Sequence, residues 1–200
     1  MPRTLPLGGV AGCIRHLRLA ENILIEDGFG QVWMMAPAAF VTPGMINHMA
    51  GTARGIVSLA MELERFAALG LSFLPRRNGA RDDVDVGISF EACEGVTTGI
   101  SAQDRALTVR AAAQDPIWQG AITTPGHVIP LIERPDGLTA RAGVAEVSLA
   151  LLRSAGLPPL AVVCAVLTEE GRDCAAEDVP VTEGLRGLAF LSRENHAELD

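Results

Sequence analysis

The sequence predicts a domain of the α/β or α+β class, in which helices cover a mixed β-sheet. Segments with helical and with strand-like spacing of apolar residues alternate along the chain, and no internal repeat or linker divides it. Hydrophobic residues make up 48% of the chain and charged residues 20%, which is enough apolar material for a substantial core. A length of 200 residues suits one domain, so we expect residues 1–200 to form a single unit.

The spacing of apolar residues predicts each element in turn. Helices are expected over residues 10–20, 43–54, 101–113 and 143–155, with a short one through Phe66 and Leu69. Strands are expected over residues 22–25, 32–35, 56–61, 86–92 and 160–167. The last of these is apolar throughout, which favours a central place in the sheet.

Three local signals mark helix ends. Thr42 followed by Pro43 is a typical N-cap and first helical position, and Gly55 is expected to end that helix. Ser101 and Asp104 have the spacing of a capping box at the start of the next long helix. Residues 75–85 are rich in arginine and aspartate and are predicted to form a solvated loop.

Composition excludes several functions. The formal net charge of −8 argues against binding to nucleic acid or to an anionic membrane surface. The chain contains no lysine, so a Schiff-base or phosphate-loop lysine is excluded. The absence of tyrosine removes a phenolic acid, base or oxyanion donor.

The four cysteines, Cys13, Cys93, Cys164 and Cys174, form no CxxC pair. This spacing suggests neither a zinc site nor a disulfide scaffold, and reduced thiols favour a cytoplasmic location. Gly28-Phe29-Gly30 lacks the third glycine of a dinucleotide-binding turn, and the four histidines are scattered. Pattern alone therefore supports a globular domain and no particular activity.

Five segments nevertheless resemble one family in collinear order. Residues 94–105 read EGVTTGISAQDR and residues 125–128 read PGHV. Residues 42–59 match a helix and the strand after it, and residues 155–164 and 169–171 match a late strand and an acidic turn. These are similar to segments of the 3,4-dihydroxy-2-butanone 4-phosphate synthase family, which makes the four-carbon unit of riboflavin from ribulose 5-phosphate. The resemblance implies an α+β fold, a three-layer sandwich of α/β type with a mixed β-sheet covered by helices. It also implies a homodimer with sites near the subunit interface.

The chain departs from the family pattern in the acidic catalytic loop. Glu26 and Asp27 match the entrance of the loop. Phe29 then stands where the resemblance places a metal-binding glutamate, Gln31 where it places a second glutamate, and Trp33 where it places an aspartate.

Two further departures lie later in the chain. Val144 stands where the resemblance places a metal-binding histidine, and Ala165 where it places a catalytic glutamate. Magnesium requires oxygen ligands in near-octahedral geometry, and neither phenylalanine nor valine offers a ligand. We therefore expect no metal and no cofactor.

Other positions retain the family residues. Arg141, Thr97, Thr98 and Ser101 resemble positions that hold the substrate and its phosphate, and His127 matches a histidine that the family needs for activity. An arginine and two hydroxyls could clamp a phosphate or carboxylate. Alternatively, the threonines shape a turn and cap a helix, and Arg141 forms a structural salt bridge.

The substitutions predict an apolar cavity lined by Phe29, Val32, Trp33, Met34 and Val144, which would suit a substrate less polar than a pentulose phosphate. Phe29 and Trp33 could instead fill the cavity. The candidate catalytic residues are His127 as acid or base, Glu26, Asp27 and Cys93.

Three hypotheses about function follow. The first is a metal-independent lyase- or isomerase-like enzyme of specialised (natural-product) metabolism, without the parent activity, which isomerises, eliminates or cyclises a small molecule. The second is a non-catalytic binding or partner protein on the same scaffold. The third is a working 3,4-dihydroxy-2-butanone 4-phosphate synthase. We expect the first.

Overall fold

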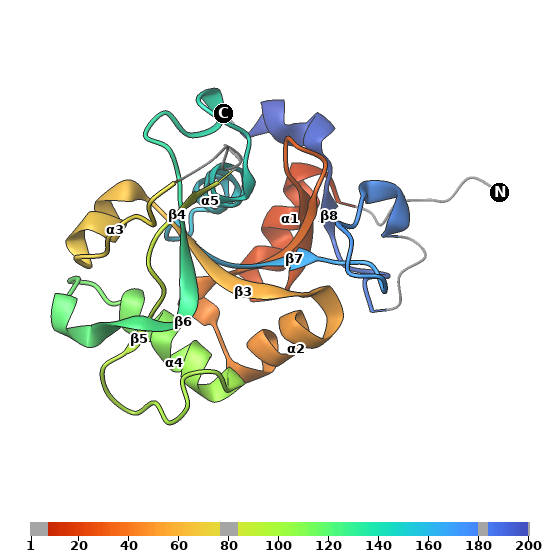
Figure 1. Ribbon diagram of the computed structural model, residues 1–200. Helices are drawn as coiled ribbons and strands as arrows, with labels where there is room; N and C mark the ends of the chain where they lie inside the picture. The colour runs from red at the N-terminus through yellow and green to blue at the C-terminus, as the bar shows by residue number, and fades with distance from the viewer. Residues whose placement is uncertain (1–7, 77–83, 180–183, 200) are drawn as a thin grey trace.

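In the computed structural model, which describes residues 8–76, 84–179 and 184–199, eight strands form one mixed sheet (Figure 1). The strands are β1 (Ile23–Glu26), β2 (Val32–Pro37), β3 (Arg54–Met61), β4 (Asp85–Val86), β5 (Phe90–Ala92), β6 (Ile122–Ile132), β7 (Leu160–Val166) and β8 (Phe190–Leu191). Their order is β4-β6-β3-β7-β2-β1-β8, with β5 also paired to β6. The pairs β3–β6 and β1–β8 are parallel and the others antiparallel.

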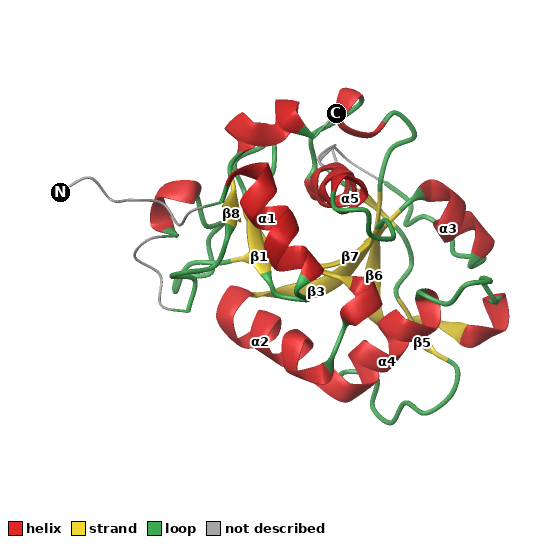
Figure 2. Ribbon diagram, turned by 180° about the vertical axis from the view of Figure 1, so that it is seen from behind, coloured by secondary structure: helices red, strands yellow, loops and turns green. Residues whose placement is uncertain are grey.

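Helices cover both faces of this sheet. The α-helices are α1 (Gly9–Arg18), α2 (Pro43–Ala53), α3 (Leu63–Ala68), α4 (Ala102–Ala112) and α5 (Val144–Ser154). Figure 1 shows α2 and α4 below the sheet and α1 and α5 above it, and Figure 2 shows the same layers from behind. This arrangement confirms the predicted α+β class with helices on both sides of a mixed sheet.

The middle strand β7 joins the two halves of the core. Val162 and Cys164 pack with the cluster under α2 and α4, whereas Ala161 and Val163 pack with the cluster under α1 and α5. Because successive strand residues face opposite sides, a strand buried on both faces is apolar throughout. The predicted central position of residues 160–167 is confirmed.

Local signals account for the starts of two long helices. Thr42 Oγ1 accepts from the Met45 amide at 3.2 Å, and Ser101 Oγ accepts from the Asp104 amide at 3.0 Å. The predicted end of α2 at Gly55 is wrong. The helix ends with Arg54 in the left-handed conformation, at a φ of 68°. Gly55 lies in β3, where a Cβ would overlap the Ala165 backbone.

Two strand predictions need correction. The single strand expected over residues 86–92 is two strands, β4 and β5, separated at Gly87, where a Cβ would overlap the rings of Phe66 and Pro130. The eleven-residue strand β6 was not predicted. Its two prolines, Pro125 and Pro130, cannot donate to a ladder and hide the strand pattern.

Two sequence expectations concern surface segments. Most of the loop expected over residues 75–85 lies outside the described residues, and Asp85 belongs to β4. Within the described part of the chain, no helix combines the length and the apolar character that a membrane crossing requires.

Candidate functional site

A cavity of about 930 Å³ opens beside the turn between β1 and β2. That turn forms one wall, and the first residue of α5 and the segment after β7 form others. The lining residues are Asp27, Phe29, Gly30, Gln31, Trp33, Leu74, Pro75, Arg76, Val84, Val86, Val144, Ala165, Asp173, Cys174 and Ala175. The volume lies in the range of small-molecule sites, and the lining is mainly apolar with a few polar groups.

Asp27 organises the β1–β2 wall of the cavity. Its Oδ1 accepts from the amides of Phe29 at 2.9 Å and Gln31 at 3.0 Å, and its Oδ2 accepts from Trp33 Nε1 at 2.9 Å. The residue is 5% exposed. These bonds satisfy a buried charge and fix the turn, so Asp27 shapes the site from beneath.

The predicted lining is only partly correct. Phe29, Trp33 and Val144 line the cavity, and Phe29 remains more than half exposed, so it does not fill the space. Val32 and Met34 point to the other side of the sheet and are buried in the core under α2. They alternate with Trp33 along β2, so one face of this strand builds the site and the other the core.

Glu26 lies next to Asp27 but faces away from the cavity. Its Oε2 accepts from the Arg193 amide at 3.1 Å, and its backbone carbonyl oxygen lies 2.8 Å from His196 Nε2. The structure thus places the Glu26 carboxylate at the C-terminal segment.

Arg141 is buried in a network of ion pairs behind the cavity. Its guanidinium donates to Glu146 Oε1, at 2.6 Å from Nη2 and 3.1 Å from Nε, and its Nη1 lies 3.4 Å from Asp85 Oδ2. Asp85 also accepts from Arg76 at 2.6 Å and Arg134 at 3.0 Å. This geometry fits the alternative in which Arg141 forms a structural salt bridge, and anion binding by Arg141 stays a prediction.

Three residues that match the family segment, Thr97, Gly99 and Ser101, form hydrogen bonds with Asp104 at the start of α4. Asp104 Oδ2 accepts from Thr97 Oγ1 at 2.9 Å and from the Gly99 amide at 3.1 Å, while Ser101 caps the helix. Thr98 is exposed on the same loop. This network shapes the loop over residues 94–101, as the structural alternative expects, and a substrate role for these hydroxyls stays a prediction.

The Asp104 network predicts a pH dependence. Burial raises the carboxyl pKa, but hydrogen bonds from Thr97, Ser101 and Gly99 outweigh it and hold the pKa below its ordinary value of 3.8. The ionised form therefore stabilises the fold fully above the unfolded pKa, and this stabilisation is lost as pH falls through the folded pKa.

We expect Asp104→Asn to lose less stability than the unsubstituted protein from about pH 5 to about pH 2, measured by urea denaturation at each pH. Asp136→Asn, at an exposed position outside the network, should follow the unsubstituted protein. Equal acid losses in the Asp104 variant and the unsubstituted protein would contradict this account.

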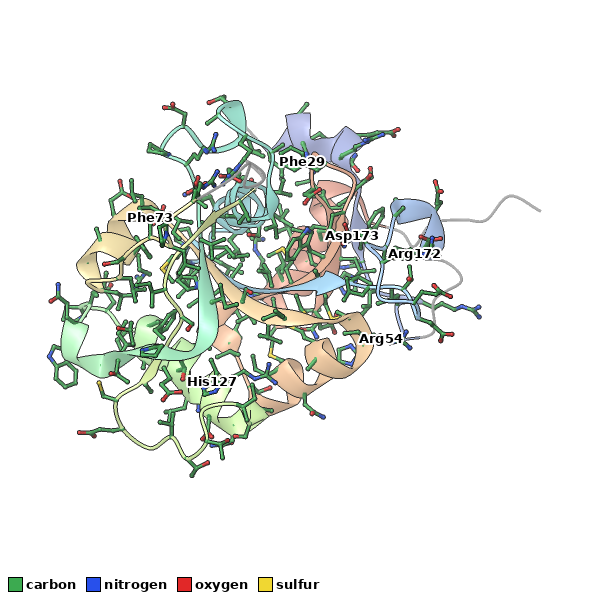
Figure 3. All side chains as sticks on the ribbon, viewed as in Figure 1. Phe29, Arg54, Phe73, His127, Arg172 and Asp173 are labelled. Atoms are coloured by element: carbon green, nitrogen blue, oxygen red, sulfur yellow. The ribbon has the colours of Figure 1, made fainter. Side chains whose placement is uncertain are left out.

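His127 and Cys93 lie away from the cavity. Figure 3 shows Phe29 and Asp173 on the upper side of the molecule and His127 on the lower side. Cys93 is exposed just after β5, and its amide donates to the Ala121 carbonyl at 3.0 Å. Within one chain, the predicted catalytic residues are therefore not brought together.

Sequence reasoning missed two polar residues of the cavity, Arg76 and Asp173. Arg76 lies in the segment predicted as a solvated loop, and Asp173 follows the acidic turn 169–171. The one sequence signal for a role of Asp173 was that the turn before it is part of the family resemblance. Charged residues in turns are most often solvated, so their polarity alone does not predict a site.

Fold and cavity together define a three-layer protein with a ligand-sized site beside a mixed sheet. A sequence model of the 3,4-dihydroxy-2-butanone 4-phosphate synthase family matches residues 13–195. The chain belongs to this family.

Individual relatives carry the same name. The synthase of Pseudomonas aeruginosa is 38% identical over 170 residues, which are 84% of this chain and 47% of that protein. The synthase of Neisseria meningitidis serogroup A is 40% identical over 161 residues, or 79% of this chain and 44% of that one. The chain thus spans about half the length of these curated relatives. A two-domain synthase from A. baumannii has a solved structure with a TM-score of 0.86 and 31% identity, covering 94% of this chain and 56% of that one.

These comparisons correct the expected function. The prediction of a divergent enzyme acting on a different, less polar substrate in natural-product metabolism is wrong, because relatives at 38 and 40% identity are named as the synthase itself. Neither a metal-independent reaction nor a natural-product role is supported. The membership of this synthase family agrees with the resemblance.

A solved structure with 27% identity and a TM-score of 0.82, covering 94% of both chains, is described as a synthase in complex with two magnesium ions. The lining of the present cavity does not fit such an ion. The carboxylates of the lining are those of Asp27 and Asp173. The Asp27 carboxylate already accepts three hydrogen bonds from the residues of the β1–β2 turn and Trp33. Phe29 and Val144 offer no ligand atom. Across the described ranges, no group of three or more His, Cys, Asp and Glu side chains could hold a metal.

Proposed function

We propose that the chain is a lyase that converts ribulose 5-phosphate to 3,4-dihydroxy-2-butanone 4-phosphate and formate. The observation that carries the proposal is the 38% identity over 84% of the chain to a protein named for this product. Atoms balance without a co-reactant, because the five-carbon substrate divides into a four-carbon phosphate and formate.

The chain's own residues suggest how such a substrate would be held. Arg76 brings a guanidinium to the cavity wall, where it would attract the phosphate. Asp173 is our candidate for the base that takes a proton from the carbon next to the carbonyl. Trp33 and Val144 would exclude water from the sugar. No step is assigned to a metal, since the lining does not fit one.

We further propose a homodimer in the cytoplasm, as the resemblance implies. His127 is exposed and lies outside its own chain's cavity, so a second copy is needed to bring this imidazole to a reacting sugar. The four cysteines are unpaired, as is usual for proteins of a reducing compartment.

A second candidate is a non-catalytic binding protein on this scaffold. One observation favours it: the cavity wall does not fit magnesium, and its Asp27 serves the turn. Such a protein would bind a sugar phosphate at Arg76 and release it unchanged.

The experiment incubates the purified chain with ribulose 5-phosphate and magnesium chloride, and formate is measured with a formate dehydrogenase assay. We expect formate release, and a loss of about 10²-fold or more in Asp173→Asn. Glu170→Gln, at an exposed position in the same turn, is the matched control and should keep full activity. Calorimetric binding of the sugar phosphate without formate would replace the proposal by the second candidate. Absence of both would overturn the two together.

A further inference from the structure

An imidazole–carboxylate pair joins two strands on the side of the sheet away from the cavity. His127 Nδ1 of β6 lies 2.9 Å from Glu91 Oε2 of β5. The His127 side chain is 42% exposed and that of Glu91 22%. We infer that Glu91 and Gly99 are positioning residues, which hold His127 in one tautomer with its Nε2 as the basic atom. The purpose of that atom rests on the proposed function.

The pairing of β5 with β6 brings the two side chains together. The register of the pair shifts between Phe90 and Glu91, so Phe90 pairs with Val128 and Glu91 with Thr123. At Gly126 a Cβ would overlap the backbone of Phe90 and Glu91. Only glycine permits this approach, and the approach places the His127 ring within reach of the Glu91 carboxylate.

Gly99 closes the pair from the loop over residues 94–101. A Cβ at Gly99 would overlap both Glu91 Oε2 and His127 Nδ1, so the loop backbone packs directly on the pair. Its amide is anchored to Asp104 Oδ2 at 3.1 Å. The two strands and the loop therefore surround the Nδ1 side of the imidazole, while 42% of the His127 side chain remains exposed.

The contact with Glu91 determines which ring nitrogen of the neutral His127 side chain carries the proton. An ionised carboxylate only accepts hydrogen bonds, so the neutral His127 ring donates from Nδ1 to Glu91. Nε2 then carries the lone pair. A carboxylate that orients an imidazole in this way supports acid–base catalysis by fixing the tautomer.

The first test reads the tautomer directly. Protein labelled with ¹⁵N-histidine is recorded at about pH 8.5, where neutral imidazole prevails. We expect the ¹⁵N signals of His127 to be those of the Nδ1–H tautomer. In Glu91→Ala these signals should shift toward those of a free imidazole, in which the two tautomers are mixed. Glu94→Ala, at an exposed position in the adjoining loop, should leave the signals unchanged. An Nε2–H tautomer in the unsubstituted protein, or no change in Glu91→Ala, would overturn the inference.

The second test separates contact from backbone strain at Gly99. Gly99 and Gly171 share a φ of +76°, but a Cβ at Gly171 meets nothing within 4 Å. Both glycine-to-alanine variants should lose stability through the same unfavourable φ. Only Gly99→Ala should change the His127 tautomer. If the two variants keep the same tautomer, Gly99 has no positioning role.

A third measurement links the pair to turnover. Glu91→Ala should lower kcat for formate release by at least about tenfold while KM for ribulose 5-phosphate stays nearly constant. An unchanged kcat in an active protein would overturn the link. If the unsubstituted protein releases no formate, the proposed function fails, and the tautomer measurements still decide whether Glu91 and Gly99 position His127.

Discussion

Glu146→Ala is expected to lower the free energy of unfolding by about 3–5 kcal/mol, measured by urea denaturation. Glu146 is 0% exposed, and its Oε1 accepts from Arg141 at two nitrogens and from the Arg134 amide at 3.0 Å. Removal of the carboxylate takes two charge-assisted hydrogen bonds from the buried Arg141 guanidinium, whose Nη1 lies 3.4 Å from Asp85 Oδ2. Removing one partner of a buried, hydrogen-bonded ion pair is among the most costly changes in a protein interior.

The matched control for this prediction is Glu170→Ala. The Glu170 and Arg172 side chains are 66% and 77% exposed, and their pair spans 3.4 Å. Exposed pairs contribute about 0–1 kcal/mol, so this variant should unfold almost like the unsubstituted protein. Similar losses of unfolding free energy in Glu146→Ala and Glu170→Ala would show that burial does not increase the contribution of the Arg141 ion pairs to stability.

Asp27→Ala is expected to cost roughly 2–4 kcal/mol and to disturb the cavity, because three donors lose a charged acceptor together. The affected groups are the Phe29 and Gln31 amides and the Trp33 indole. Denaturation gives the stability, and the fluorescence of Trp33, compared with a Trp33→Phe variant, reports the cavity wall.

The control for Asp27→Ala is Asp173→Ala, which removes the carboxylate contributed by the segment after β7. We expect a change within about 0.5 kcal/mol there, as for substitutions away from a hydrogen-bond network. A stable Asp27→Ala protein with unchanged Trp33 fluorescence would mean that the turn holds its shape without the carboxylate.

The parts of the fold that the sequence predicts are those with local causes. Thr42 and Ser101 cap helices through their own side chains, and the apolar segment 160–167 can be stable only between two covered faces. Strand β6 has no such signature. Its residues from Thr123 to Pro125 are exposed, and its place in the sheet depends on pairing with β3, whose residues lie far away in the chain.

The candidate site divides in the same way. Family resemblance places Phe29, Trp33 and Val144 together, and the structure has all three at the cavity. The pairing of Arg141 with Asp85 was not predictable, because Asp85 comes from a segment whose polarity reads as solvated loop. The partner of a charge depends on three-dimensional approach, which composition and spacing do not encode.

The middle position of β7 has a consequence for synthesis of the protein. Strands β2 and β3 are consecutive in the chain but do not touch, since β7 lies between them and pairs with both. A polypeptide emerging from the ribosome must therefore keep two apolar half-sheets unjoined until residue 160 and beyond have been made. Such late closure favours slow folding and exposes unpaired edges to aggregation, so we expect chaperones to matter most for this protein during its translation.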